Sequence, residues 1–345
     1  MTNPETKPRK KRRSGLKSLK SFRLWLGLAL SGGSILFLVS SINPDQVASA
    51  LGSANYLLVI PSIAMVFVTM FLKAIRWQLL FGSDKPPIKK LYSSLLIGYM
   101  ANAILPARLG EVVRAYNIGR SSSVSTSKAL STIVVEKVLD IATVLIILIL
   151  LIPIAPLPDW AFRMGVVGAA VVVVLLLVSF ALVLYGDRVA AIAGRVGSQI
   201  PYLKKMPVEK QVASFAAGFD VLRRGRLALP IIFWSIVIWL GAAAINYVML
   251  LAFDPHAPLV SALFVLAVTN LGMAVPSAPS YIGVFHYLVV ISLAVFGISQ
   301  SLALSYAIVL HVATFGSFVV SGLILMWREQ FSLSMVDPDT LQSQT

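Results

Sequence analysis

The sequence predicts an all-α, polytopic integral membrane protein, and its composition and its long apolar runs support this fold class. Hydrophobic residues make up 58% of the chain and charged residues 12%, whereas soluble domains contain roughly 45–50% and 25%. Several apolar runs approach the ~20 residues that a helix needs to cross about 30 Å of hydrocarbon. These spans must be helical because lipid cannot satisfy free backbone groups, and no run has the alternating pattern of barrel strands.

The first element is a basic segment. Residues 1–22 are expected to form a cytoplasmic tail, since the run KPRKKRR at positions 7–13 precedes the first apolar run. A basic tail in this place is the positive-inside signal of membrane proteins, and it attracts anionic lipid headgroups at about 1 kcal/mol per basic residue. The net charge of +15 therefore does not call for a nucleic-acid partner. The run 24–42 is longer than the core of a usual signal peptide, so we expect a retained anchor.

The apolar runs predict about eight transmembrane helices within one membrane domain, residues 23–328. The predicted spans are 24–42, 56–72, 129–152, 162–185, 229–252, 259–275, 283–298 and 304–327. We expect residues 186–226 to form a cytoplasmic loop and residues 329–345 to form a disordered cytoplasmic tail. The segment 91–105 is also apolar, but as a helix it covers only about 22 Å, which is too short for a comfortable crossing.

The distribution of Lys and Arg decides how the segment 91–105 is placed. If it crossed the membrane, the basic residues from Arg108 to Lys128 and those of the loop 186–226 would lie outside the cell, against the positive-inside rule. If it enters and returns on the cytoplasmic side, every basic loop lies inside. We therefore predict a re-entrant segment in a protein of the cell membrane, with both termini in the cytoplasm. Irregular backbone at membrane depth is tolerated inside protein or beside a watery cavity, so the segment also indicates a cavity.

A second irregular stretch follows later in the chain. In TNLGMAVPSAPSYIGVFH, residues 269–286, two Pro, flanking Gly and several hydroxyl residues interrupt an apolar run. The spacing of Asn102, Pro106 and Gly110 loosely matches that of Asn270, Pro276 and Gly283. Broken segments in corresponding positions of two halves indicate the binding site of transporters built from inverted repeats. We therefore consider an inverted repeat possible.

The segment after residue 105 carries the first group of candidate site residues. Arg108, Glu111 and Arg114 follow one another at steps of three and share one flank of a helix, so Glu111 can pair with either Arg. Arg is the preferred residue for forked hydrogen bonding to phosphate. Gly110 permits close approach of a headgroup or of a neighbouring helix. The alternative is a juxtamembrane Arg cluster that only orients the protein.

Two carboxylates inside a predicted span form the second group. Glu136 and Asp140 stand four residues apart on one helix face, and Asp140 is about 18 Å along the helix from Lys128. Inserting a charged side chain into a membrane costs at least ~2.5 kcal/mol, so a charged residue inside a span indicates a structural or functional role. Either a cation compensates the two like charges or one carboxyl is protonated, and the nearest cations in sequence are Arg108 and Arg114. An inert ion-pair network that fixes helix register is the alternative to a functional cluster.

Arg76 and His286 allow two interpretations each. Arg76 lies in FLKAIRWQLLF at the end of the second span, where it is either part of the site or a snorkelling interface anchor. His286 follows the broken segment and could relay protons, although a lone membrane His is usually only hydrogen-bonded. Three scattered His and no Cys make a metal site improbable, and no P-loop, G-x-S-x-G or H-E-x-x-H motif is present. We expect no cofactor.

Four segments together resemble a known family. LPARLGEVVRAY at 105–116, IRWQLL at 75–80, VVEKVLD at 134–140 and PSAPSYIGVFH at 276–286 are similar to the flippase-like transmembrane domain of lysylphosphatidylglycerol synthases, the membrane half of the multiple peptide resistance factor. The resemblance covers roughly residues 20–330. It implies an integral membrane protein that handles phospholipids or polyprenyl-linked lipids. The candidate substrate-binding residues are Arg76, Asn102, Arg108, Gly110, Glu111, Arg114, Glu136, Asp140, Tyr281 and His286.

Two departures from the family pattern limit what the resemblance implies. Full synthases carry a soluble aminoacyl-transfer domain after the membrane part, whereas this sequence stops soon after Arg328. The late motif also has Ser280 and His286 where a second Gly and often an acid are expected. Lysyl transfer by this chain alone is therefore not predicted.

The leading prediction is a lipid flippase that moves an anionic phospholipid, an aminoacyl-phospholipid or a polyprenyl-phosphate-linked lipid across the membrane. Arg108 and Arg114 would hold the phosphate, with Glu111 orienting them, and Glu136 and Asp140 would line the deeper path. One alternative is a membrane transferase that joins an aminoacyl or glycosyl group to a lipid, with Glu136 or Asp140 as general base. Another is a scaffold for a separate synthase or glycosyltransferase.

Overall fold

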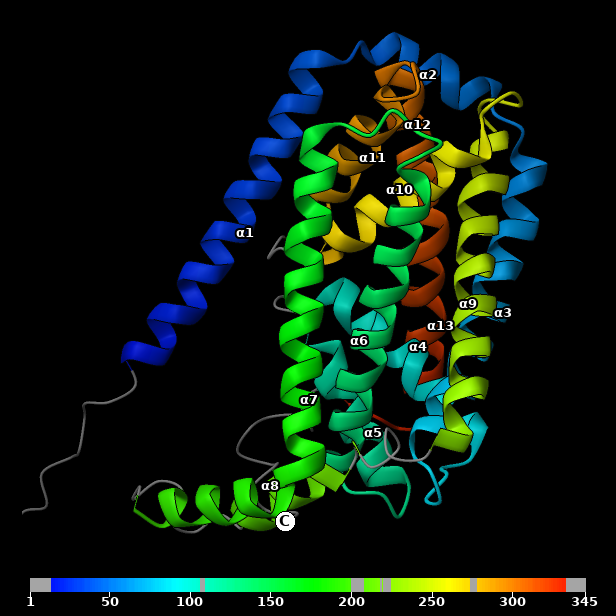
Figure 1. Cartoon of the computed structure of the whole chain (residues 1–345). Coiled ribbons are helices and arrows are strands. Elements are labelled where there is room, and N and C mark those ends of the chain that lie inside the picture. Colours follow the sequence, from blue (N-terminus) through cyan, green and yellow to red (C-terminus); the bar gives the residue numbers. More distant parts are fainter. Residues whose placement is uncertain are drawn as a thin grey trace, which may run out of the picture.

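A computed structural model describes residues 14–105, 109–199, 208–217, 219, 225–273 and 278–332. Within these ranges every regular element is a helix, which confirms the all-α fold class. Four long helices run side by side between two ends of the molecule, which are the upper and lower ends in Figure 1. They are α3 (Val59–Leu80), α6 (Thr126–Leu151), α7 (Asp159–Gln199) and α9 (Gly225–Leu251).

The last span is built from three consecutive pieces. α12 (Gln300–His311) continues through one π-helical turn, η5 (Val312–Gly316), into α13 (Ser317–Arg328). Together they form one apolar helix of 29 residues. Single π turns inside α-helices are rare and frequently mark functional sites, and this one lies halfway along the span.

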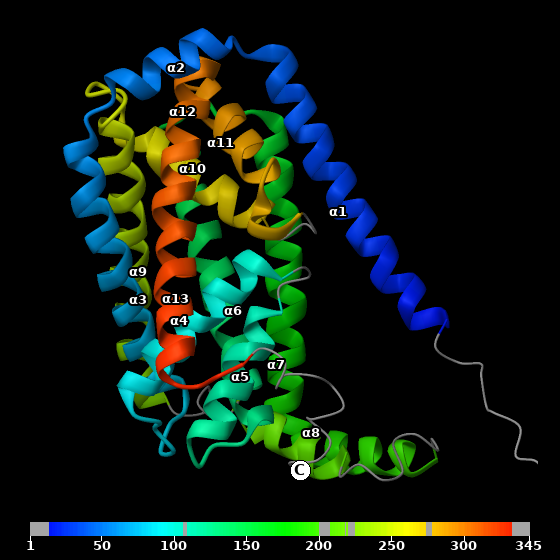
Figure 2. The ribbon, with the colours of Figure 1, turned by 180° about the vertical axis from the view of Figure 1, so that it is seen from behind.

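The predicted re-entrant segment is a short helical hairpin. α4 (Ile88–Ile104) rises from the lower end to the middle of the molecule, and α5 (Gly110–Ser121) returns to the lower end (Figures 1 and 2). α4 has 17 residues and α5 has 12, so neither matches the ~20 residues of a full crossing. The connecting residues 106–108, which include Arg108, lie outside the described residues.

A second hairpin enters from the opposite end and corrects the predicted number of spans. α10 (Leu259–Gly272) and α11 (Val284–Ala294) have 14 and 11 residues and occupy the upper half in Figure 2. The predicted spans 259–275 and 283–298 are therefore not two crossings. Their apolar composition is that of a span, but buried half-length helices are equally apolar, so composition alone could not separate the two.

Fewer than eight helices meet the length and apolarity of a membrane span. In the described residues four do, and a fifth arises if α1 (Ser14–Ser41) and α2 (Pro44–Ser53) count as one span bent by 90°. α6 has 26 residues but carries three charged residues within its apolar part, Glu136, Lys137 and Asp140. The arrangement of a long helix, two short helices and a long helix occurs twice, with the hairpins pointing in opposite directions. This is the element order that an inverted repeat requires.

The two ends of the molecule differ in charge. Lys89 at the start of α4, Lys128 in α6, Arg226 in α9 and Arg328 at the end of α13 all belong to the ends of helices at the lower end. α8 (Val208–Ala217) lies across the same end in Figure 1. At the upper end, α2, η1 (Tyr56–Leu58) and the turn before α10 contain no Lys or Arg. In place of the predicted loop, residues 186–199 continue α7 beyond a bend at Tyr185, where φ is −123° and ψ is 17°.

The hairpins meet the rest of the protein through very close helix crossings. A methyl group added to Gly322 in α13 would lie 2.4 Å from Cβ of Met100 in α4. The turn between α10 and α11, η4 (Pro279–Tyr281), contacts α4. The two hairpins are therefore in contact with each other. Of the predicted tail 329–345, residues 333–345 lie outside the described part.

Candidate functional site

One face of α6 presents the charged residues around which the candidate site is built. Glu136, Lys137 and Asp140 belong to consecutive turns of this helix, and Glu136 and Asp140 are both buried. Because residues four apart on a helix lie one above the other, the two carboxylates point to the same side. That side packs against α3 and α5.

Glu136 is paired with Arg114 of α5. The two terminal guanidinium nitrogens of Arg114 donate to Oε1 and Oε2 of Glu136 at 3.1 and 2.9 Å. Its guanidinium carbon also lies 4.1 Å from the ring centre of Trp77, and Trp77 donates from Nε1 to Thr132 Oγ1 at 2.9 Å. A forked, stacked pair of this kind combines charge-assisted hydrogen bonds with a cation–π contact. It fixes α5 against α3 and α6.

Asp140 is paired with Arg76 of α3. Arg76 donates to Asp140 Oδ1 at 2.6 Å and to Ser235 Oγ of α9 at 3.0 Å. Its side chain is fully buried, which excludes the interpretation of Arg76 as a snorkelling interface anchor. Lys73 lies one helical turn away, with Nζ 4.0 Å from Asp140 Oδ2 and 2.9 Å from the hydroxyl of Tyr99. Both predicted carboxylates thus have a compensating cation, but only one of these cations is a predicted partner.

Glu111 pairs with Lys137 rather than with Arg114. Lys137 Nζ lies 3.2 Å from Glu111 Oε1. Asn102, at the end of α4, accepts from the backbone N–H of Gly110 at 2.8 Å. This bond satisfies one of the N–H groups that are free at the start of a helix, so Asn102 holds the two arms of the hairpin together.

Two glycines bring α4 and α5 into direct contact. A methyl group added to Gly110 would lie 2.0 Å from the carbonyl oxygen of Gly98, and one added to Gly98 would lie 2.2 Å from Cγ of Arg114. Because real Cβ atoms do not approach so closely, both positions need glycine. The prediction that Gly110 permits close approach is confirmed for a neighbouring helix.

The described charges of this region do not cancel. Seven charged side chains form the network: Lys73, Arg76, Arg114, Lys137, Glu111, Glu136 and Asp140. Four cations face three carboxylates, which leaves one positive charge in excess. We call these seven residues the ion-pair network.

Tyr281 and His286 lie on the opposite hairpin. Ser280 and Tyr281 have positive φ values of 58° and 59°, a conformation that costs non-glycine residues roughly 1 kcal/mol or more each. The ring of Tyr281 lies 5.9 Å from that of Phe315, and the ring of His286 stacks on that of His311 at 4.9 Å. In the described residues no group of three His, Cys, Asp or Glu could hold a metal ion.

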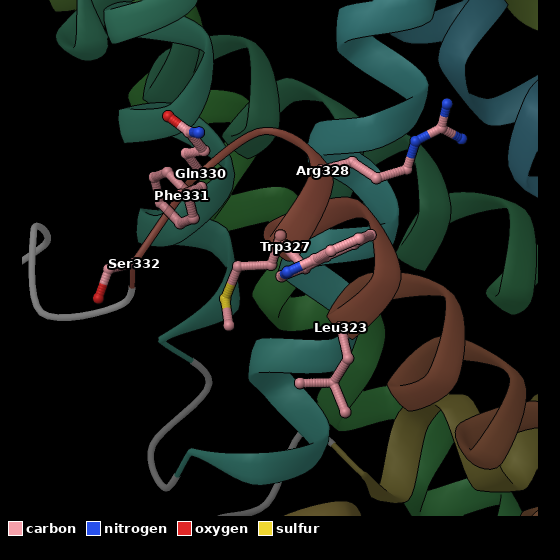
Figure 3. A pocket seen from close by; sticks show the side chains of 7 residues that line it. Leu323, Trp327, Arg328, Gln330, Phe331 and Ser332 are labelled. Atoms are coloured by element: carbon pink, nitrogen blue, oxygen red, sulfur yellow. The ribbon is translucent and has the colours of Figure 1, made fainter.

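A hollow in the described surface lies away from this network, at the end of α13. It measures about 830 Å³ and is lined by Leu323, Trp327, Phe331 and neighbouring residues. Figure 3 shows Arg328 directed away from the other side chains. Trp327 is 82% exposed, as is typical of aromatic residues at a membrane–water interface. We do not assign this surface as the site.

Several residues of the network were absent from the sequence-based candidates. The missed members are Lys73 and Lys137, and Tyr99 and Trp77, which contact its cations, were missed as well. The sequence did hold a signal for the two lysines, because Lys73 precedes Arg76 by three residues and Lys137 follows Glu136 within an apolar run. Tyr99 and Trp77 had no such signal, because aromatic residues are common in membrane helices.

Comparison with known proteins places this architecture among membrane proteins. The family described as the lysylphosphatidylglycerol synthase TM region matches residues 24–322. A UPF0104 membrane protein of Methanothermobacter thermautotrophicus is 24% identical over 302 residues, which are 81% of this chain and 88% of that protein. A UPF0104 membrane protein of Methanocaldococcus jannaschii is 22% identical over 232 residues, 66% of this chain and 92% of that protein.

A third relative bears the name of an enzyme. Glycosyltransferase AglD of Haloferax volcanii is 24% identical over 343 residues, which are 89% of this chain. The matched region makes up 54% of that protein, so this chain spans about half of its length.

Proposed function

Because this chain belongs to the lysylphosphatidylglycerol synthase TM region family, we propose that it is a lipid translocase. Its substrate is an anionic phospholipid, an aminoacyl-phospholipid or a polyprenyl-phosphate-linked lipid. The membrane is the cell membrane, and both termini face the cytoplasm, because the basic helix ends gather at one end of the molecule. The chemistry of the site supports lipid movement in addition to the family name.

The ion-pair network is the observation that carries this proposal. Ionisable residues inside membrane proteins are expensive and mark the paths of substrates and ions. Here such residues join the helical hairpin α4–α5 to α3 and α6. In repeat-built transporters, substrate sites lie where broken helices meet near the middle of the membrane, and here the described turn η4 of the second hairpin contacts α4 of the first.

The chemistry of the network suits a phosphate group. A buried guanidinium left without a partner costs several kcal/mol, so Glu136 and Asp140 neutralise Arg114 and Arg76 while no substrate is bound. A phosphate offers the same forked arrangement of acceptor oxygens as a carboxylate. A headgroup can therefore replace a carboxylate partner without leaving a cation unpaired, and the carboxylates release it again.

Arg108, which precedes α5 in the sequence, belongs to the proposed path. We retain Arg108 as a proposed phosphate-binding residue because it adjoins the start of α5, where Gly110 and Glu111 lie. Its own contacts lie outside the described residues. Tyr281 and His286 are proposed to line the path on the opposite hairpin.

A transferase is the second candidate function, and the name of the Haloferax relative favours it. General-base catalysis needs a carboxylate oxygen free to accept a proton. Both oxygens of Glu136 already accept from Arg114, and Asp140 Oδ1 accepts from Arg76. This geometry disfavours Glu136 as a general base, whereas Asp140 Oδ2, 4.0 Å from Lys73 Nζ, is the candidate base of a transferase. A scaffold for a separate synthase or glycosyltransferase is a third candidate, which co-purification from membranes would test.

Reconstitution in proteoliposomes distinguishes these functions. A fluorescent phosphatidylglycerol in both leaflets is bleached by an impermeant reductant only in the outer leaflet. A translocase raises the bleached fraction from about half toward completeness, whereas a transferase or scaffold leaves it unchanged. Incubating the detergent-solubilised protein with a labelled nucleotide sugar and polyprenyl phosphate tests the transferase, because product forms there without any sidedness.

A further inference from the structure

A partly open cavity beside the ion-pair network has a lining that suits an anion. It measures about 190 Å³ and lies between α3, α4, α9, α10 and the last span. Its polar lining includes Lys73, Tyr99, Trp239, Asn270 and Thr314. Both hairpins contribute to the wall, α4 through Tyr99 and α10 through Asn270. The cavity therefore lies at the junction of the two hairpins.

The excess positive charge of the network is located next to this cavity, because Lys73 lines it. Arg114, Arg76 and Lys137 each have a carboxylate oxygen within 3.2 Å. Lys73 is 4.0 Å from Asp140, whose nearer partner is Arg76 at 2.6 Å. Its short contact is with the neutral Tyr99 hydroxyl at 2.9 Å. Lys73 is thus the cation of the described network without a carboxylate of its own.

Trp239 provides an independent indication of a ligand. It is 6% exposed and lines the cavity, and its indole N–H has no hydrogen-bond acceptor among the described residues. A buried donor without an acceptor costs roughly 1–3 kcal/mol, so such groups call for an explanation. An anion in the cavity would accept from this N–H and from Lys73 together.

The last span also changes its geometry at this cavity. Thr314 belongs to the π turn η5, which packs against α3, and it lines the cavity. π turns concentrate at functional sites. The cavity is smaller than the ~300–1,000 Å³ of pockets for drug-sized ligands. It therefore admits a compact charged group and excludes a bulky headgroup such as a sugar chain.

We propose that this cavity binds the phosphodiester of a lipid with a small anionic headgroup, held by Lys73 and the indole N–H of Trp239. This inference rests on the proposed translocase and specifies the size and charge of its substrate. Tyr99 and Asn270 line the same space and orient the oxygens of the headgroup. The free phosphate ion shares the chemistry of the diester, so the test must separate the two.

The test measures binding of water-soluble headgroups to the full-length protein in detergent by isothermal titration calorimetry. The probes are glycerophosphoglycerol, which is an anionic diester, glycerophosphocholine, which is zwitterionic, and inorganic phosphate. We expect binding of the anionic diester and weaker binding of the other two. Equal or tighter binding of inorganic phosphate would mean a site for the free ion and would overturn the lipid assignment. The absence of any binding would overturn the site itself.

Matched variants test whether the headgroup binds in this cavity. Lys73→Gln should weaken binding roughly tenfold or more, because a hydrogen bond to a charged group is lost, and Trp239→Phe roughly threefold to tenfold. Lys73→Arg keeps the charge and should restore most of the affinity. Trp234→Phe, on the same helix but outside the cavity lining, should bind as the wild type does. Unchanged binding in Lys73→Gln, with its helical content and thermal unfolding intact, would contradict the proposal.

The outcomes also separate this proposal from the proposed function. If lipid is translocated but Lys73→Gln binds glycerophosphoglycerol normally, the cavity assignment fails and the translocase survives. If no lipid is translocated but the diester binds in a Lys73-dependent manner, the cavity assignment survives and the translocase fails.

Discussion

The guanidinium of Arg114 donates hydrogen bonds to both carboxylate oxygens of Glu136, at 3.1 and 2.9 Å. The central carbon of this guanidinium lies 4.1 Å from the ring centre of Trp77. This relationship connects three different helices. α5 supplies the cation, α6 the carboxylate and α3 the aromatic ring. The pair therefore determines where the hairpin stands relative to the long helices.

The Arg114–Glu136 pair should show strong coupling in a double-mutant cycle. Arg114→Gln and Glu136→Gln each leave a buried charge without its partner and should destabilise the protein by roughly 3–5 kcal/mol. The double variant should lose less than the sum of the two. Thermal unfolding of the purified variants in detergent measures this. Additive losses, or single variants as stable as the wild type, would show that the pair is not a stabilising contact.

Arg76 should be sensitive even to a conservative change. Its guanidinium reaches Asp140 and Ser235 at the same time, at 2.6 and 3.0 Å, and a single ammonium group lacks this fork. We expect Arg76→Lys to keep the charge and the fold but to lower the lipid translocation rate roughly tenfold. Lys89→Gln, an exposed basic residue at the start of α4, is the matched control and should retain the wild-type rate.

Gly110 should be intolerant of a methyl group. The added Cβ would lie 2.0 Å from the carbonyl oxygen of Gly98, so α5 must shift and the Arg114–Glu136 pair must open. Overpacking of this kind costs typically ~1–3 kcal/mol, and the opened pair adds to it. Gly52→Ala in α2, where no atom lies within 4 Å, should be neutral or slightly stabilising. Equal thermal stabilities of the two variants would contradict the close crossing.

The proposed orientation can be tested by cysteine labelling, because the chain contains no Cys. Asp45→Cys in α2 and Lys89→Cys in α4 each introduce one thiol at an exposed position, at opposite ends of the molecule. An impermeant maleimide should label position 45 in intact cells and position 89 only after permeabilisation. The reverse pattern would place the basic end outside.

The sequence was sufficient for the fold class and for the first hairpin. Length and apolarity indicated membrane helices and showed that 91–105 is short for a span, and the charge bias favoured a re-entrant segment. The same reasoning failed for 259–275 and 283–298. No Lys or Arg lies between them. The positive-inside rule, which depends on these residues, therefore could not distinguish two crossings from one hairpin. The signal that remained was the broken stretch 269–286.

The sequence indicated several residues of the candidate site, but it did not indicate which of them form ion pairs with one another. A compensating cation was expected for Glu136 and Asp140, because isolated charges are costly in a membrane. The sequence suggested Arg108 and Arg114 as neighbours, but Arg76, 64 positions before Asp140, is the actual partner of Asp140. Contacts between distant helices depend on tertiary packing, and no local period encodes them. For the same reason Trp239 and Asn270 could not be assigned to one cavity.

Lipid translocation by matched variants is the most direct test of the central claim, that the ion-pair network moves a phosphate-bearing headgroup. The measurement is the bleached fraction of fluorescent phosphatidylglycerol in proteoliposomes that contain equal amounts of folded wild type, Arg76→Lys or Lys89→Gln. We predict near-complete bleaching with the wild type and Lys89→Gln, and a fraction close to that of protein-free liposomes with Arg76→Lys over the same time. Equal bleaching by all three proteins would contradict a role of the network, and no bleaching beyond protein-free liposomes with the wild type would contradict translocation itself.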